Sequence, residues 1–410
     1  MKHWAVITKN SNHYQSLISR ILAQEHVAGF ESLQHKKGIS FSKNTLNEYL
    51  HREDVHDIRF ITNGLLAKKS SGEQKRILFR LLRNKEFDYL ILDNPYDAID
   101  VAYQSYLQEE LKQISQYKEL IIFSSRIHDV PEFCSQFGYT GANGIEWFTS
   151  LISLKRVVNA TQLSFPEFHL PHKTHIDFNI DPLITFKNVS VSYEDQHVLS
   201  EISWTIRPKE FWHVIGPNGS GKTTLLSLIT GDNPKGYGQD IALFGMQKGN
   251  GETIWDIKKH IGYVTPSMTH KFNGHHTVEH MLISGLVDAI GLYSIPTSAQ
   301  KQTAAIWLKN IGMSAKRAIT FSDLTQGEQR LVLVARAMIK QPKLLILDEP
   351  TMALDDNSAL HLTHLIQEIS ERTTTCILYV SHRKEANITP TAVLNLFPSE
   401  TGSKATVTYL

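Results

Sequence analysis

The residues most able to do chemistry stand between Gly216 and Thr224, in the sequence GPNGSGKTT. Glycines at three places let the backbone turn tightly and direct N–H groups at phosphate oxygens. Lys222 and Thr223 follow at the P-loop spacing, where the ammonium would reach the β- and γ-phosphates and the hydroxyl would bind Mg²⁺. The sequence therefore predicts a nucleotide site formed by Gly216, Pro217, Asn218, Gly219, Ser220, Gly221, Lys222, Thr223 and Thr224.

A strand and a helix must hold this loop in place. Phe211–Ile215 is a short apolar run typical of a buried strand, and residues 224–229 are apolar enough for a helix that Gly231 can end. The start of that helix adds the positive end of its dipole beside the phosphates. A glycine turn before an ordinary helix is the alternative, and the lysine and threonine at their offsets argue against it.

Further segments surround the loop in a fixed order, and with them the second half resembles an ATP-binding cassette (ABC) ATPase domain. They are Tyr193, LTQGE at 324–328, KLLILDE at 343–349, ALD at 353–355 and SH at 381–382. The resemblance implies ATP and Mg²⁺ as cofactors, with Asp348 and Thr223 as the metal-binding residues and Glu349 as general base. It also implies that His382 contacts the γ-phosphate and that Tyr193 stacks on adenine. An acidic turn, a surface histidine and a packed tyrosine are the plain alternatives, and the order of the segments favours the ABC roles.

The chain contains a diverged repeat. Residues 72–100 and 327–355 align without gaps, with 12 identities in 29 positions. Both copies start with Gly-Glu-Gln, continue as a helix-like segment and a buried strand, and finish at an aspartate. We therefore expect an α/β fold of the P-loop NTPase class, with two tandem ABC ATPase domains of which the first is truncated. The expected divisions are 1–160 for a degenerate domain without a P-loop, 161–182 for a linker and 183–410 for a complete domain.

The first half has lost the groups that bind phosphate and activate water. TKNSNHYQ, residues 8–15, stands where GPNGSGKT stands in the second half, so the three glycines are gone and Tyr14 replaces the lysine. Asn94 takes the place of Glu349, and Ser125 that of His382. Because side chains stand where the backbone must approach the phosphates, we expect no nucleotide site here. The amide of Asn94 also cannot act as a carboxylate base. The distance from this loop to Gly-Glu-Gln is also shorter, at 64 residues against 111, so much of an inserted subdomain is missing or reduced.

The first half nevertheless keeps SSGEQ, residues 70–74, while the second half has LTQGE as a variant of the LSGGQ signature. ABC domains act as head-to-tail pairs, and the resemblance implies that each ATP lies between one P-loop and the other domain's signature. Ser70, Gly72 and Glu73 would then complete the second half's site, which leaves one live ATP site per chain. Pairing within one chain fits the linker, while a homodimer of second halves that uses residues 325–328 stays open.

The run from Thr230 to Val264 resembles the ModF-type tandem ABC ATPases, a family associated with molybdenum transport. The resemblance covers nearly the full second half and, more loosely, residues 1–140. These proteins normally carry an intact first P-loop, which this chain lacks, so a single hydrolysing site is expected. The first functional hypothesis is therefore the ATPase subunit of a transport system, with molybdate as cargo and a membrane permease subunit as partner.

One departure favours a different function. In ABC domains a glutamine normally follows the strand after the P-loop helix, but here Pro266 follows IGYVT. That glutamine helps to bind Mg²⁺ and marks the contact with membrane subunits, so its absence favours a soluble ATP-driven switch acting on a protein or nucleic-acid partner. A ribosome-acting tandem factor ranks third, because residues 161–182 are short and rich in proline instead of a long charged helix. A scaffold that does not hydrolyse ATP would leave Glu349 idle, and the intact site argues against it.

Composition agrees with a globular cytoplasmic protein. The chain is 41% apolar and 20% charged, and its net charge of +1 gives no strong signal for nucleic acid or anionic membranes. Its two cysteines suit a reducing cytosol, and no stretch has the length of a transmembrane helix. We expect a cytoplasmic location, peripheral on the inner face of the plasma membrane if a permease is the partner. A metal site on His276 and His280, within a cluster that includes His270 and His275, competes with a solvated loop, which we favour.

Overall fold

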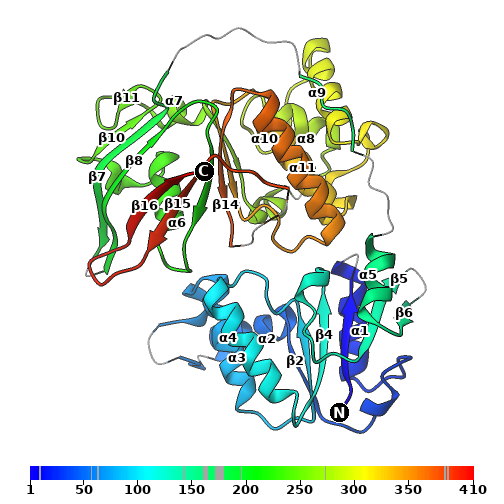
Figure 1. Cartoon of the computed structure of the whole chain (residues 1–410). Helices are drawn as coiled ribbons and strands as arrows, with labels where there is room; N and C mark the ends of the chain where they lie inside the picture. The colour runs from blue at the N-terminus through cyan, green and yellow to red at the C-terminus, as the bar shows by residue number, and fades with distance from the viewer. Residues whose placement is uncertain are drawn as a thin grey trace. The chain divides into compact units, whose positions relative to one another are not determined.

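The structure is a computed structural model that describes the chain from 1 to 410 except residues 9–10, 57, 62–63, 142–143, 160–164, 171–179, 195, 273, 383–384 and 386 (Figure 1). It divides into two compact units. Unit 1 comprises Met1–Leu163 with Ala353–Asn357, and unit 2 comprises Ser164–Met352 with Ser358–Leu410. Much of the expected linker, at 161–164 and 171–179, lies outside the described residues.

Unit 1 is built on one six-stranded sheet in the order β2-β3-β4-β1-β5-β6, in which only the β5–β6 pair is antiparallel. Its strands are β1 His3–Ile7, β2 Gly38–Phe41, β3 Tyr89–Asp93, β4 Glu119–Ser124, β5 Gln136–Gly141 and β6 Gly144–Phe148. The helices are α1 Ser11–Leu22, α2 Lys43–His56, α3 Ser71–Arg83, α4 Val101–Ile114 and α5 Leu151–Asn159, with short 3₁₀ turns η1 Glu31–Leu33, η2 Leu66–Lys68 and η3 Ile127–Asp129.

Both faces of this sheet are buried, as expected for parallel strands that read as continuous apolar runs. Ala5 and Leu92 belong to the core under α3 and α4, whereas Trp4, Val6 and Ile91 belong to the core under α1. Alternate residues of each strand thus pack on opposite faces of the sheet. A shift of one residue would reverse these faces, so the register of β1 between β4 and β5 is fixed.

Unit 2 has a six-stranded sheet with the same order, β12-β13-β14-β9-β15-β16. The strands are β9 Phe211–Ile215, β12 Ile261–Val264, β13 Leu344–Asp348, β14 Cys376–Val380, β15 Ala392–Phe397 and β16 Lys404–Tyr409. Each strand corresponds in order to one strand of unit 1, and again only the last pair is antiparallel. The expected α/β tandem fold is confirmed at the level of topology.

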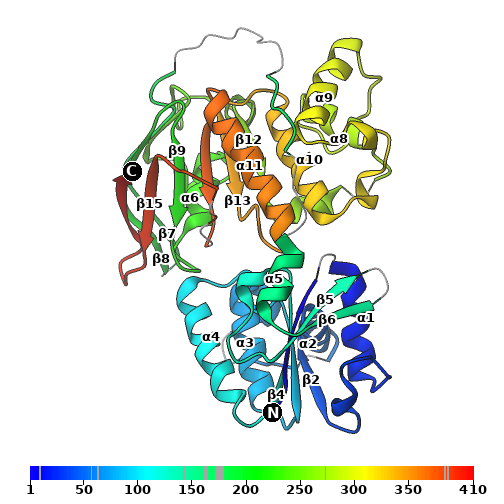
Figure 2. The ribbon, with the colours of Figure 1, turned by 45° about the vertical axis from the view of Figure 1, so that its right-hand side comes forward.

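A second, antiparallel sheet distinguishes unit 2. Its order is β11-β10-β7-β8, with β7 Ile184–Tyr193, β8 Gln196–Ile206, β10 Asp240–Leu243 and β11 Met246–Gln247. Figure 2 shows β7 and β8 beside β9 in green, next to the P-loop helix α6 Lys222–Ile229. The described part of unit 1 has no counterpart of this sheet. Alternating apolar residues of β7 and β8 pack into the same core as β9 and α6.

The segment between β12 and β13 is also larger than its counterpart in unit 1. It contains η5 Pro266–Lys271, α8 Val278–Ser284, α9 Ser298–Asn310, η6 Ser314–Lys316, η7 Phe321–Asp323 and α10 Gln326–Met338. Between β2 and β3, unit 1 has α2, η2 and α3 alone among the residues described. The remaining elements are η4 Pro234–Gly236 and α7 Ile254–Lys258 of unit 2, and α11 Asp356–Arg372, which belongs to unit 2 from Ser358 onward. None of the helices described in either unit is both long and apolar enough to cross a bilayer.

Candidate functional site

The P-loop connects the end of β9 to the start of α6, which begins at Lys222, two residues earlier than expected. The earlier start has a backbone cause: Gly221 caps the helix in the left-handed region, with φ of 84°. Its carbonyl accepts the Leu225 N–H at 2.8 Å, which closes the first turn. The N–H groups of that turn, with the positive end of the helix dipole, face the loop.

The three glycines are required for different physical reasons. Gly219 and Gly221 have φ of 79° and 84°, where a side chain is strained. A Cβ on Gly221 would also come within 2.7 Å of Leu199, and one on Gly216 would come within 2.5 Å of the Ser220 hydroxyl. A side chain at 216 or 221 would force these neighbouring atoms or the loop to move.

Lys222 folds over the loop. Its Nζ donates to the carbonyl oxygen of Gly216 at 2.6 Å and to that of Pro217 at 3.0 Å. The ammonium is therefore held on the concave side of the backbone turn, where it can meet a phosphate. The same charge acts on Asp348 at the end of β13: burial raises the pKa of that carboxyl, and Lys222 lowers it.

The turn after β13 puts Glu349 in the left-handed region, with φ of 49°. Its N–H donates to the Val380 carbonyl at 2.8 Å, which ties the end of β13 to the end of β14. A glutamate in this region costs about 1 kcal/mol. Asn94, at the same position of the repeat, has φ of 41°, so this turn conformation is common to both units.

His382 lies beside this carboxylate. Its Nε2 is 3.4 Å from Glu349 Oε1, close enough for an ion pair when the imidazole is protonated. The side chain of His382 is only 10% exposed. The structure thus places Glu349 beside His382, although the two residues are far apart along the chain.

Buried Arg330 holds the turn from the other side and was not recognised from the sequence. Its NH1 donates to the Pro350 carbonyl at 3.0 Å and lies 3.5 Å from that of Glu349. Burial lowers the pKa of Arg330 to about 10. Lys75 occupies the matching position of the repeat and donates to the carbonyl of Asn94 at 2.8 Å. A basic residue at both places in the alignment was the available signal.

The residues of this site fit a nucleoside triphosphate with Mg²⁺. The Ser220 hydroxyl is buried and, within the part of the chain that the structure describes, has no hydrogen-bond partner. Together with the cradle that admits no Cβ at Gly216 and Gly221, this orphaned group is what a phosphate oxygen would satisfy. Thr223 at the start of α6 and the partly buried Asp348 supply oxygen donors of the kind that Mg²⁺ prefers.

Tyr193 ends β7, and the residue is 41% exposed. Its hydroxyl accepts a hydrogen bond from the Asn233 amide at 2.8 Å. Pro266, at the place of the usual glutamine, begins the 3₁₀ helix η5, and its carbonyl accepts from the Thr269 hydroxyl at 2.8 Å. The hydroxyls of Thr265 and Ser267 flank it, 2.8 Å apart.

The equivalent strand ends of unit 1 are closed by its own side chains. Tyr14, at the lysine position, is buried and donates its hydroxyl to Asp93 Oδ1 at 2.9 Å. Asn94, at the position of the general base, has φ of 41° and donates to the Tyr14 oxygen at 2.9 Å. Its Oδ1 accepts the N–H of Ser125, the residue at the histidine position, at 2.9 Å. Tyr14, Asp93, Asn94 and Ser125, which we call the closed triangle, are thus joined by hydrogen bonds at these strand ends. Lys9 and Asn10 of the loop lie outside the described residues.

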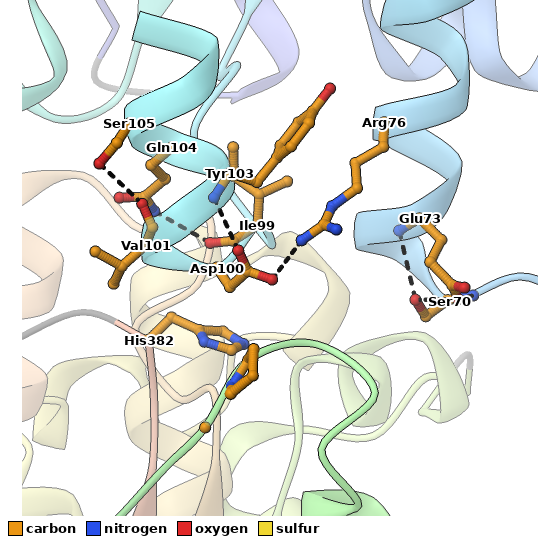
Figure 3. A network of polar contacts seen from close by, with 12 residues as sticks. Ser70, Glu73, Arg76, Ile99, Asp100, Val101, Tyr103, Gln104, Ser105 and His382 are labelled. Carbon is orange, nitrogen blue, oxygen red and sulfur yellow. Dashed lines mark hydrogen bonds and ion pairs between the residues drawn. The ribbon is translucent and has the colours of Figure 1, made fainter. Parts of the chain in front are cut away.

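The signature segments begin matching helices. Ser70 caps α3, and Thr325 caps α10; each forms a capping box with the glutamate three residues on, Glu73 or Glu328. Figure 3 shows the Glu73 N–H donating to the Ser70 hydroxyl, at 3.4 Å. The figure also shows Arg76 of α3 reaching Asp100, which caps α4. Gly72 is buried in the first turn of α3. The capping role is a structural reason for retaining Ser70 and Glu73 that applies with or without ATP.

One residue of the histidine cluster, His276, packs against two glycines. The His276 ring lies between Gly274 and Gly291, and a Cβ on either glycine would come within 2.7 Å of it. The backbone N–H of His280 donates to the Thr277 hydroxyl, which caps α8. No group of three or more metal-ligating side chains occurs among the described residues, and the His270 side chain lies outside them.

Comparisons with known proteins agree with this geometry. A family model described as ABC transporter matches residues 199–352. The chain is 38% identical over 329 residues to the ABC transporter ATP-binding protein ModF of Escherichia coli, a match that covers 77% of this chain and 67% of that protein. It is 31% identical over 319 residues to an uncharacterised ABC transporter ATP-binding protein of Schizosaccharomyces pombe, covering 73% of this chain and 62% of that protein. The chain thus spans about two thirds of the length of these relatives.

Among solved structures, the chain is similar to an archaeal ribosome recycling factor, aABCE1, in complex with the archaeal ribosomal stalk protein aP1. The TM-score is 0.61 at 14% identity, and the match covers 98% of this chain and 85% of that one. At this identity the likeness concerns the fold alone.

Proposed function

The chain belongs to the ABC ATPase family, whose members hydrolyse ATP, and we propose that its own hydrolysis takes place at a single site on unit 2. The contrast between equivalent strand ends carries the proposal. On unit 2 the charge of Lys222 acts on Asp348, and His382 lies beside Glu349; at the corresponding positions of unit 1, Tyr14, Asn94 and Ser125 are joined by hydrogen bonds.

In this proposal the P-loop from Gly216 to Thr224 binds the phosphates, and Lys222 turns from the loop carbonyls to their negative charge. Mg²⁺, held by Thr223 and Asp348, would neutralise the charge that develops on the β- and γ-phosphates. Glu349 takes the proton of the attacking water, and His382, 3.4 Å away, orients that carboxylate and contacts the γ-phosphate. Tyr193 stacks on the adenine.

The first test is ATP turnover of the purified chain. Glu349→Gln removes the base and should slow turnover by roughly 10²–10⁴-fold. His382→Ala should also slow it, while the matched change in unit 1, Ser125→Ala, should leave it unaltered. Equal loss from His382→Ala and Ser125→Ala would contradict a single site on unit 2.

We further propose that the first unit supplies its signature, Ser70, Gly72 and Glu73, to complete that site. The proposal rests on the family's head-to-tail pairing and on the retention of this segment in a half that has lost its own phosphate cradle. Because a capping box alone would also retain Ser70 and Glu73, the test must keep the cap. Ser70→Thr keeps the hydroxyl cap and should hydrolyse ATP, and Ser70→Ala measures the loss of the cap alone; Ser70→Arg, which adds bulk and charge at the site, should lose far more activity than Ser70→Ala. If Thr325→Arg inactivates the chain and Ser70→Arg does not, two second halves pair in a homodimer instead.

The cellular role follows from the same resemblance. We propose an ATPase component of a transport system, cytoplasmic and peripheral to a membrane permease, with molybdate as the cargo. A soluble switch acting on a protein or nucleic-acid partner is the second candidate, because Pro266 begins η5 at the place of the glutamine that marks contact with membrane subunits. Copurification from cells separates the two: a permease among the partners supports transport, and a soluble partner without a permease supports the switch.

A further inference from the structure

A chain of hydrogen bonds connects the aromatic ring of Tyr193 to the phosphate-binding helix. The hydroxyl of Ser227, on α6, donates to the Thr224 carbonyl at 2.7 Å. The Asn233 amide donates to that Ser227 oxygen at 2.9 Å and to the Tyr193 hydroxyl at 2.8 Å. The relay therefore starts in the first turn of the P-loop helix and ends on the ring that would meet the base.

Asn233 is built to be rigid. It is 5% exposed, and it caps η4 by accepting the Lys235 N–H at 3.0 Å. Its own N–H donates to the Ser227 carbonyl at 3.1 Å. Both amide hydrogens and the amide oxygen thus have partners, and this set of partners fixes which way the amide points.

We propose that Asn233 is a positioning residue for base recognition. Its hydrogen bond to the Tyr193 hydroxyl holds the Tyr193 ring in one orientation, the one in which the ring stacks on the base. This inference rests on the proposed function, since it assumes that ATP binds at the P-loop with Tyr193 against adenine. A partly exposed ring on the last residue of a strand would otherwise rotate. Fixing it before binding avoids the cost of ordering it in the complex.

The direct test compares two probes, ATP with Mg²⁺ and inorganic tripolyphosphate, which has the phosphates without a base. Binding is measured by calorimetry on the Glu349→Gln chain, so that hydrolysis does not interfere. Asn233→Ala should weaken ATP binding about fivefold, the effect of one hydrogen bond, and leave tripolyphosphate binding unchanged. Equal weakening of both probes would mean that Asn233 supports the P-loop helix alone, and would overturn the proposal.

Tyr193→Phe keeps the ring and removes the hydroxyl, and it also serves if Asn233→Ala does not fold. It should weaken ATP binding as much as Asn233→Ala does, and the double variant should be no weaker than either single one. Additive losses would overturn the proposal. When Asn233→Ala or Tyr193→Phe is made in the chain with Glu349 intact, KM for ATP should rise and kcat should stay unchanged.

Gln239→Ala is the matched control. The Gln239 amide donates to the Ser190 carbonyl of β7 at 2.7 Å, so it tethers the same strand without touching Tyr193. It should leave ATP binding unaltered. If Gln239→Ala weakens ATP binding as much as Asn233→Ala does, loss of the contacts that hold β7 explains both effects, and the proposal fails. A parent Glu349→Gln chain that binds neither probe would instead refute the proposed nucleotide site itself.

Discussion

Tyr14→Phe should destabilise unit 1, because it removes one hydroxyl that makes two partly buried hydrogen bonds. The hydroxyl donates to Asp93 at 2.9 Å and accepts from Asn94 at 2.9 Å. A hydrogen bond to a carboxylate contributes roughly 1.5–3 kcal/mol. The Asn94 amide keeps its bond to Asp93 at 3.0 Å, which limits the further loss. We expect the free energy of unfolding to fall by about 2 kcal/mol.

The penalty should depend on pH in a defined direction. Burial raises the pKa of Asp93, and the hydrogen bond from Tyr14 opposes that rise by favouring the ionised form. A group with a raised folded pKa contributes stability that is present in acid and is lost as the pH rises through the folded pKa. Tyr14→Phe raises that pKa further, so the variant loses more stability as Asp93 ionises. The difference from the parent chain should be small in acid and reach its full size at neutral pH.

Hydrogen exchange with mass spectrometry reads the effect locally. Peptides from β1 and β3 should exchange on the order of 30-fold faster at neutral pH, as about 2 kcal/mol implies, while those from β13 and β14 should be unaffected. Tyr96→Phe is the matched control in the same unit: the Tyr96 hydroxyl is buried with no hydrogen-bond partner among the described residues, so its removal should cost nothing. Equal penalties from the two variants, or a Tyr14→Phe penalty that does not change with pH, would refute the reasoning.

Three further outcomes follow from unit 2 and from the thiols. Gly221→Ala should abolish ATP binding measured by calorimetry, because the residue has φ of 84° and its Cβ would lie 2.7 Å from Leu199. Gly251→Ala is the control for backbone strain, because the exposed Gly251 also has a positive φ but has open space around it. Arg330→Met should lower the thermal midpoint and the turnover, since it leaves the buried Pro350 carbonyl without its donor at a cost of about 1–3 kcal/mol; normal turnover at normal stability would contradict this role. Native Cys134 should resist a thiol reagent at neutral pH, because burial raises its pKa to about 12, and rapid labelling without denaturant would refute that.

The strand, loop and helix of the P-loop could be predicted from sequence because local residue types determine them. An apolar run, three glycines and a lysine specify the strand, the loop and the helix. The repeat between residues 72–100 and 327–355 predicts that the second half has a diverged copy in the first half. The identical strand order of the two sheets confirms that expectation. The helix start was misplaced by two residues, since the left-handed φ of Gly221 decides it and composition does not.

Contacts between distant residues could not be predicted in the same way. The loss of lysine at Tyr14 was visible, but its hydrogen bond to Asp93, 79 residues away, depends on how β1 and β3 are arranged around β4. Asn233 likewise reads as an ordinary turn residue before a proline. Only the position of η4 under the end of β7 brings its amide to Tyr193.

The closed triangle of unit 1 also makes the loss of its site difficult to reverse by single mutations. Tyr14→Lys alone would put an ammonium in a buried place whose loop has none of the glycines that shape the cradle. Asn94→Glu alone would add a second carboxylate beside Asp93, whose pKa burial already raises. Each single step back destabilises the unit before any phosphate can bind. Selection acting one residue at a time therefore faces a fitness valley, and the asymmetry between the halves is entrenched by packing as well as by lost catalytic groups.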